Sequence, residues 1–175
     1  LNNTALVNKF EKKVAMFHDL FGAFCIKHSD YQLVVKTKST PTAIEYAHTL
    51  FNKYKNSLSR RLELTSSIDA NDLIHEAKYI AAYSSTTLIE SLIMGKTILS
   101  PDFSDIIEGP QDIIYPYVKL VNYITVIHDL EKIIIDEEKS IYEEKYKNEY
   151  INKMIYKPDG KSSNRVEKEL VSLLS

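Results

Sequence analysis

Four hydroxyl side chains stand next to one another near the middle of the chain, between two apolar stretches. They are Ser84, Ser85, Thr86 and Thr87, within the segment KYIAAYSSTTLIESLIMGKTILSPDF. One Ser or Thr side chain is enough to cap a helix, because it accepts a hydrogen bond from a backbone N–H of the first turn. Several short hydroxyls can also donate hydrogen bonds to an anion at a helix start, where backbone N–H groups are unpaired. The row therefore predicts a phosphate-binding turn, although ordinary capping explains any single one of these residues equally well.

An acidic side chain follows this row one helical turn further on. Glu90 has apolar neighbours, Ile89 and Leu92, which indicate the buried face of a helix. A carboxylate in this place can accept two hydrogen bonds from the diol of a ribose. The alternative is that Glu90 only offsets the partial positive charge of the helix N-terminus. Together with the hydroxyls, Glu90 favours a nucleoside diphosphate as the ligand.

Alternating strands and helices are expected to position these residues. The β-branched and apolar runs predict strands over residues 31–38, 61–67, 79–85 and 97–103, with a further strand near 117–123. Helical spacing predicts helices over about 4–27, 39–60, 67–77 and 88–94, and two or three later ones, including one over 136–153. This alternation predicts an α/β fold, a Rossmann-like parallel sheet with helices on both faces, whose first strand is buried on both faces. Ligands of such sheets bind at the carboxyl ends of the strands, where the hydroxyl row lies.

The composition limits the classes of protein to which the chain can belong. Its 175 residues, 44% of them apolar, predict a single domain over residues 1–175 with a packed core. The formal net charge of -2 gives no electrostatic support for nucleic acid binding. The one cysteine, Cys25, excludes a disulfide within the chain and indicates a reducing, cytoplasmic setting. The histidines lack metal-ligand spacing, so they are expected on the surface or on helix faces, and no metal is predicted.

The central segment resembles a known family of enzymes. The run SSTTLIESLIMGKTIL is similar to the donor-binding segment in the C-terminal domain of GT-B glycosyltransferases, especially those of bacterial surface and capsular polysaccharide biosynthesis. In that family a turn rich in Ser, Thr and Gly leads into a helix with a glutamate, and a glycine precedes the next strand. The matching residues here are Ile74, Ala77, Ser85, Thr86, Thr87, Glu90, Gly95, Lys96 and the following SPDF. The resemblance implies that the hydroxyl turn contacts the donor diphosphate and that Glu90 contacts the ribose.

A weaker resemblance covers the stretch LVVKTK. Lys36 matches a lysine of the family, which implies a role with phosphate or acceptor, but Lys38 stands where the family has a histidine. Many retaining relatives carry an acidic residue at the position of Ala82, so the resemblance favours an inverting mechanism or a different retaining architecture.

The resemblance implies that the chain is the donor-binding half of a two-domain transferase. The chain starts at Leu1 rather than at a methionine, as a C-terminal fragment would. The substrate would be a nucleoside diphosphate sugar, with no other cofactor. The partner would be the missing N-terminal acceptor domain, which would supply the catalytic base and any contact with the inner face of the membrane, so the isolated domain is predicted to be inactive. Two alternatives stay open: an enzyme similar to nucleotide-sugar 2-epimerases, and a module that binds a nucleotide or a protein without turnover.

Overall fold

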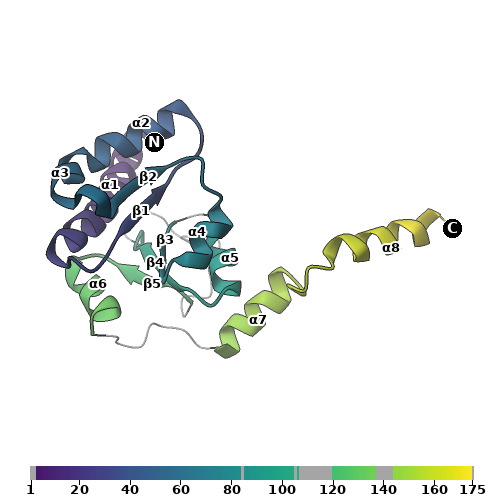
Figure 1. Cartoon of the computed structure of the whole chain (residues 1–175). Coiled ribbons are helices and arrows are strands. Elements are labelled where there is room, and N and C mark those ends of the chain that lie inside the picture. The colour runs from purple at the N-terminus through teal and green to yellow at the C-terminus, as the bar shows by residue number, and fades with distance from the viewer. Residues whose placement is uncertain (1–2, 84, 105, 107–119, 137–143, 175) are drawn as a thin grey trace.

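Strands and helices alternate along the chain, as Figure 1 shows. The computed structural model describes residues 3–83, 85–104, 106, 120–136 and 144–174. The strands are β1 (Leu33–Lys36), β2 (Leu62–Thr65), β3 (Tyr79–Ala81), β4 (Thr97–Pro101) and β5 (Asn122–Ile124). The α-helices are α1 (Asn3–Lys27), α2 (Pro41–Phe51), α3 (Lys55–Leu58), α4 (Ala70–Glu76), α5 (Thr87–Ile93), α6 (Ile127–Ile134), α7 (Glu144–Met154) and α8 (Ser162–Leu174). Two short 3-10 turns, η1 (Asn52–Tyr54) and η2 (Ser59–Arg61), flank α3.

All described strand pairs are parallel. β1 pairs with β2, with Leu33 opposite Leu62, and β4 lies between β3 and β5, with Leu99 opposite Asn122. The predicted α/β class with parallel strands is confirmed. The described strands form two small sheets, of two and three strands.

Helices cover both faces of the three-stranded sheet. Leu99 on β4 joins an apolar cluster with Phe24 of α1 and Leu130 of α6. The preceding residue, Ile98, points to the other face and joins a second cluster with Leu88 of α5. Successive side chains of a strand point to opposite faces. The sheet is therefore sandwiched between α1 and α6 on one side and α5 on the other, as predicted.

The two-stranded sheet is covered on one face. Leu33 and Val35 of β1 are half-buried and pack against the cluster that contains Phe51 and Leu58, whereas Val34 between them is 38% exposed. The prediction that this first strand is buried on both faces is wrong. Val34 and Lys36 alternate with the buried positions, because the helices that pack on β1 lie on one side of it.

Polar contacts anchor the C-terminal end of α1. The Nη1 atom of Arg61 donates hydrogen bonds to the carbonyl oxygens of Cys25 (2.5 Å), at the helix end, and Tyr31 (3.2 Å), in the connection to β1. The Glu131 carboxylate of α6 receives the Lys27 ammonium at 2.5 Å and the His28 Nε2 at 2.9 Å. The hydrogen bonds from Lys27 and then His28 hold the pKa of Glu131 below its usual range. α1 is thus tied to η2 and to α6.

The last helix, α8, extends away from the rest of the molecule, as Figure 1 shows. α7 is attached through Tyr150, which is 1% exposed and joins the cluster around Leu88. The helix predicted over residues 136–153 corresponds to α7, and residues 137–143 lie outside the described part.

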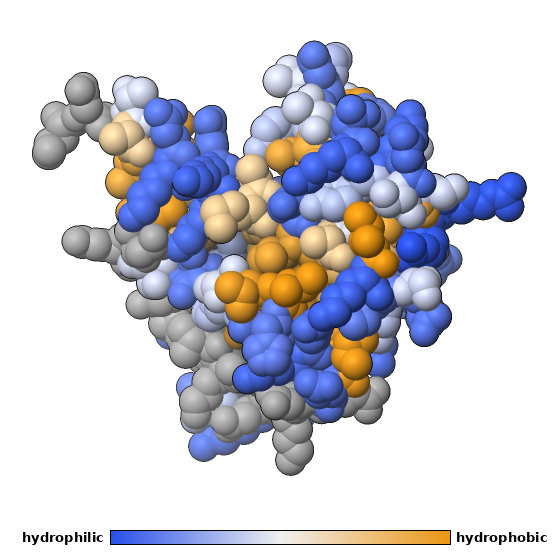
Figure 2. Space-filling view, turned by 90° about the vertical axis from the view of Figure 1, so that its left-hand side faces the viewer, coloured by the Kyte–Doolittle hydropathy of each residue, from blue (hydrophilic) through white to orange (hydrophobic). Residues whose placement is uncertain are grey.

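On the side of the molecule where α1, α3 and α6 lie, Figure 2 shows hydrophobic residues gathered in the middle of a mostly hydrophilic surface. Within the described ranges, every helix is too short or too polar to cross a bilayer.

Candidate functional site

The described hydroxyl residues Ser85, Thr86 and Thr87 lie at the carboxyl edge of the three-stranded sheet. β3 ends at Ala81 and α5 begins at Thr87, so the turn between them follows the carboxyl end of a strand that runs parallel to β4. This is the edge where open parallel sheets bind their ligands. Of the predicted residues, Ser85, Thr86, Thr87 and Glu90 are brought together here, and Ser84 lies outside the described residues.

One hydroxyl of the row caps the helix. The Ser85 Oγ accepts a hydrogen bond from the backbone N–H of Thr87 at 3.3 Å, and the Ser85 carbonyl oxygen accepts one from the N–H of Leu88 at 3.1 Å. Thr86 occupies the N-cap position, but its side chain makes no capping hydrogen bond. The capping function therefore uses Ser85 and leaves the two threonine hydroxyls available.

Within the described part of the chain, three polar side chains at the start of α5 have no protein partners. Among the described residues, no hydrogen bond or ion pair involves the side-chain oxygens of Thr86, Thr87 or Glu90. Thr86 is exposed, and Thr87 and Glu90 are half-buried. Residues three and four positions apart are neighbours on a helix surface, so Glu90 lies next to both threonines. Two hydroxyl donors and one carboxylate are thus within reach of a single polar ligand.

The rest of α5 holds this group in place. Leu88 and Leu92 are completely buried beneath the helix, and the Ser91 Oγ donates a hydrogen bond to the Thr87 carbonyl oxygen at 2.6 Å. Gly95 then ends the helix with a φ of +70°, a conformation that favours glycine. The predicted helix end at Gly95 is confirmed. Ser85, Thr86 and Thr87 therefore lie at the start of α5, a packed helix that connects β3 with β4.

Aromatic residues from distant parts of the chain gather beside the turn. Tyr83, two residues before Ser85, lies 6.0 Å from Phe10 of α1 and 5.9 Å from Phe103 between ring centroids. His18 of α1 lies 6.4 Å from Tyr83, and its Nδ1 is 2.7 Å from the Val14 carbonyl oxygen.

His18 is half-buried, and burial lowers the pKa of its ring, so the imidazole is neutral at neutral pH. Sequence reasoning missed this cluster, although His18 lies on a helix face, as expected. Phe10 and Phe103 carry no local signal that they meet.

Lys36 serves a different part of the fold. Its Nζ donates hydrogen bonds to the carbonyl oxygens of Thr37 (3.0 Å) and Ser66 (2.8 Å), which joins the loops after β1 and β2. Among the residues that the structure describes, no hydrogen bond connects Lys36 with the hydroxyl turn. A cavity of about 50 Å³ lies nearby, lined by Thr37, Ile44, Ala47, His48, Leu64, Thr65 and Ser66. It is too small for a nucleotide, since ligand pockets usually measure about 300 to 1,000 Å³.

Over the described ranges, no three His, Cys, Asp or Glu side chains are placed to hold one metal ion. Comparison of the chain with protein-family models, with curated proteins and with solved structures gave no match. The arrangement of Thr86, Thr87 and Glu90 at the start of α5 is thus the main structural support for assigning a function.

Proposed function

We propose that this chain is the donor-binding half of a glycosyltransferase that uses a nucleoside diphosphate sugar in surface polysaccharide synthesis. The observation that carries the proposal is the group formed by Thr86, Thr87 and Glu90. Within the described part of the chain, their side chains have no hydrogen-bonding partners, and they stand at the carboxyl edge of parallel strands. The resemblance of the surrounding segment to GT-B donor sites supplies the reaction class.

The chemistry assigned to each residue follows from its hydrogen-bonding capacity. The Thr86 and Thr87 hydroxyls donate to diphosphate oxygens, and their contribution grows as negative charge develops on the leaving diphosphate. Glu90, as a carboxylate, accepts hydrogen bonds from the ribose hydroxyls. A separate acceptor domain supplies the base that deprotonates the acceptor, and with it any contact with the cytoplasmic face of the membrane. The isolated chain should therefore bind the donor without transferring the sugar.

Calorimetry with UDP, CDP, GDP and TDP tests the proposal and identifies the base. Replacing Thr86 and Thr87 together by valine keeps their shape and removes two hydroxyls. We expect the affinity for the preferred diphosphate to fall by about 1 to 3 kcal/mol, the usual value of two hydrogen bonds, and the affinity for the bare nucleoside to fall much less. The melting temperature should change little, because the capping residue Ser85 is retained.

A matched control separates the loss of hydroxyls from a general effect of valine. Thr42 is an exposed threonine in the first turn of α2, so Thr42→Val makes the same change at another helix start. This control should bind like the parent. Equal diphosphate binding by the parent and the double valine variant would refute the phosphate role of the turn.

The role of Glu90 has its own test. If Glu90 binds the ribose, Glu90→Gln should weaken diphosphate binding by about 1 to 3 kcal/mol with little change in melting temperature. If Glu90 only complements the helix dipole, stability should fall while nucleotide affinity stays the same. Measured sugar transfer by the isolated chain would contradict the assignment as half of an enzyme.

A further inference from the structure

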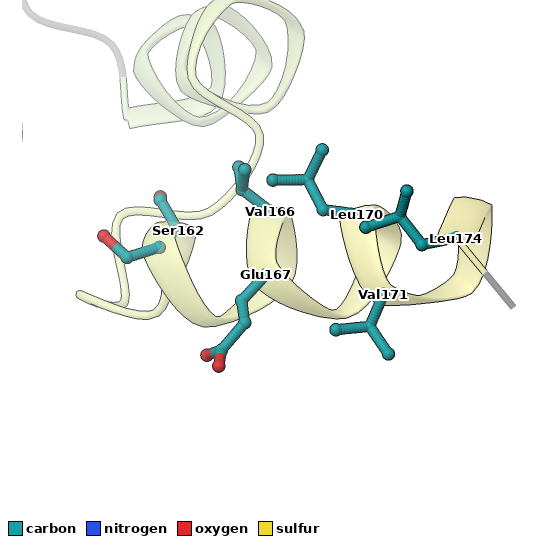
Figure 3. A pocket seen from close by; sticks show the side chains of 7 residues that line it. Ser162, Val166, Glu167, Leu170, Val171 and Leu174 are labelled. Carbon is teal, nitrogen blue, oxygen red and sulfur yellow. The ribbon is translucent and has the colours of Figure 1, made fainter.

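Helix α8 presents an apolar face that no other described element covers. Val166, Leu170 and Leu174 point to the same side of the helix, as Figure 3 shows, and are 58%, 54% and 89% exposed. Leu173, which is 81% exposed, widens the stripe. α8 contains no buried residue in its described range, and the shallow hollow along it is lined by this helix alone. A contiguous apolar stripe on an exposed helix indicates an interaction surface.

The connection before α8 holds the helix in a defined direction. The Nη1 atom of Arg165 is 2.9 Å from each carboxylate oxygen of Asp159, and its Nη2 donates to the Lys157 carbonyl oxygen at 3.2 Å. The guanidinium also lies 5.5 Å from the centroid of the Tyr156 ring. These contacts fix the first turn of α8 to the preceding loop, and the helix points away from the α/β body (Figure 1). The core of the same chain therefore does not cover the apolar stripe.

We propose that α8 is a dimerisation helix, which pairs antiparallel with α8 of a second copy of this chain. Val166 and Leu174 stand four residues on either side of Leu170. In an antiparallel pair, Leu170 thus meets its own counterpart, and Val166 meets Leu174. The two α/β bodies then lie at opposite ends of the pair, because each body precedes the N-terminal end of its own α8 (Figure 1).

The size and charge of the stripe fit this occupant. Pairing two such faces would cover Val166, Leu170, Leu173 and Leu174 of both copies, each of which is more than half exposed in the single chain. Val166, Leu170 and Leu173 follow the alternating spacing of four and three residues that is typical of paired helices. α8 carries two basic and two acidic residues, so the helices do not repel each other. The dimer is independent of the nucleotide site, and its failure would leave the proposed function untouched.

Sedimentation velocity over a concentration series tests the dimer. We expect the mass to rise from the 20.1 kDa of one chain toward twice that value in the micromolar range. Leu170→Asp should abolish the dimer. Ser172→Asp adds the same charge about 200° around the helix from Leu170 and should preserve the dimer. Circular dichroism checks that both variants remain folded, as expected for substitutions on an exposed helix.

Two results would overturn the proposal. One is a parent chain that stays monomeric at every concentration. The other is a Leu170→Asp variant that dimerises like the parent, which would place the contact elsewhere, for example on the hydrophobic area in Figure 2.

Engineered cysteines test the antiparallel register. With oxidised glutathione as the oxidant, Leu170→Cys should form a disulfide between two copies, and Ser172→Cys should not. The natural Cys25 is 3% exposed, so it does not compete. Equal cross-linking at both positions, or none at position 170, would contradict this pairing.

Discussion

Gly22 allows α1 to approach the ring of Tyr54, and replacing this glycine by alanine tests how tightly the two pack. A Cβ atom at position 22 would lie 2.5 Å from Cδ2 and 2.7 Å from Cζ of Tyr54, and closer still to Cε2. Carbon atoms in contact are normally about 3.5 to 4.0 Å apart. The ring must therefore move if alanine is to fit.

Tyr54 has little freedom to move. It is 6% exposed, and its hydroxyl donates hydrogen bonds to the Asp19 side chain at 2.5 Å and to the Asp19 carbonyl oxygen at 3.1 Å. Displacing the ring would break these bonds or disturb the buried cluster around Phe24. The hydrogen bonds to Asp19 therefore hold the Tyr54 ring in the place where it would collide with the added Cβ atom.

Two opposing effects determine the outcome of Gly22→Ala. Alanine favours the helix interior by about 1 kcal/mol over glycine. Overpacking in a dense core costs about 1 to 3 kcal/mol. Because the ring is held in place, we expect the packing cost to prevail, with a net loss of up to about 2 kcal/mol. For a chain of this size the melting temperature should fall by up to about 8 °C.

Urea denaturation followed by circular dichroism measures this loss. A second variant, Tyr54→Leu, removes the ring, and the double variant completes a thermodynamic cycle. In the Tyr54→Leu background, Gly22→Ala should be neutral or stabilising, because only the helix propensity remains. A Gly22→Ala variant that is more stable than the parent would refute the reasoning.

Three further predictions concern the anchors of the fold. Arg61→Ala should lower the free energy of unfolding, measured by urea titration, by about 1 to 3 kcal/mol, because the Cys25 and Tyr31 carbonyl oxygens lose their charged donor. The control Arg60→Ala, at an exposed neighbouring residue, should change the free energy of unfolding little. The pKa of Glu131 is lowered in the folded chain. The contribution of its carboxylate to folding stability is therefore complete above the unfolded pKa, near 4.5, and is lost as the pH falls through the folded pKa. The difference in melting temperature between the parent and Glu131→Gln should therefore be full at neutral pH and vanish in acid; a difference independent of pH would contradict this. Gly95→Ala should cost about 1 kcal/mol in thermal unfolding, since its φ is +70° and no atom lies within 4 Å of the added Cβ, so backbone strain alone acts.

The sequence by itself was sufficient for features with local causes. Val14 and Phe17 recur at helical spacing, and both are buried on α1, within the helix that this spacing predicts. Ser85 and Thr86 fall between a strand and a helix, and Gly95 ends that helix, as expected. Periodicity, capping and helix termination depend on residues a few positions apart, so they can be recognised without knowledge of the fold.

Only the tertiary structure decided which side chains serve the fold and which remain available to a ligand. It assigned the cap to Ser85 and engaged Lys36 with backbone carbonyl oxygens of two loops. It also brought Tyr83 together with Phe10 and Phe103, and divided the described strands between two sheets with one face of the smaller sheet exposed. Contacts of this kind join residues far apart in the chain, and their geometry depends on how whole elements pack, which local spacing does not encode.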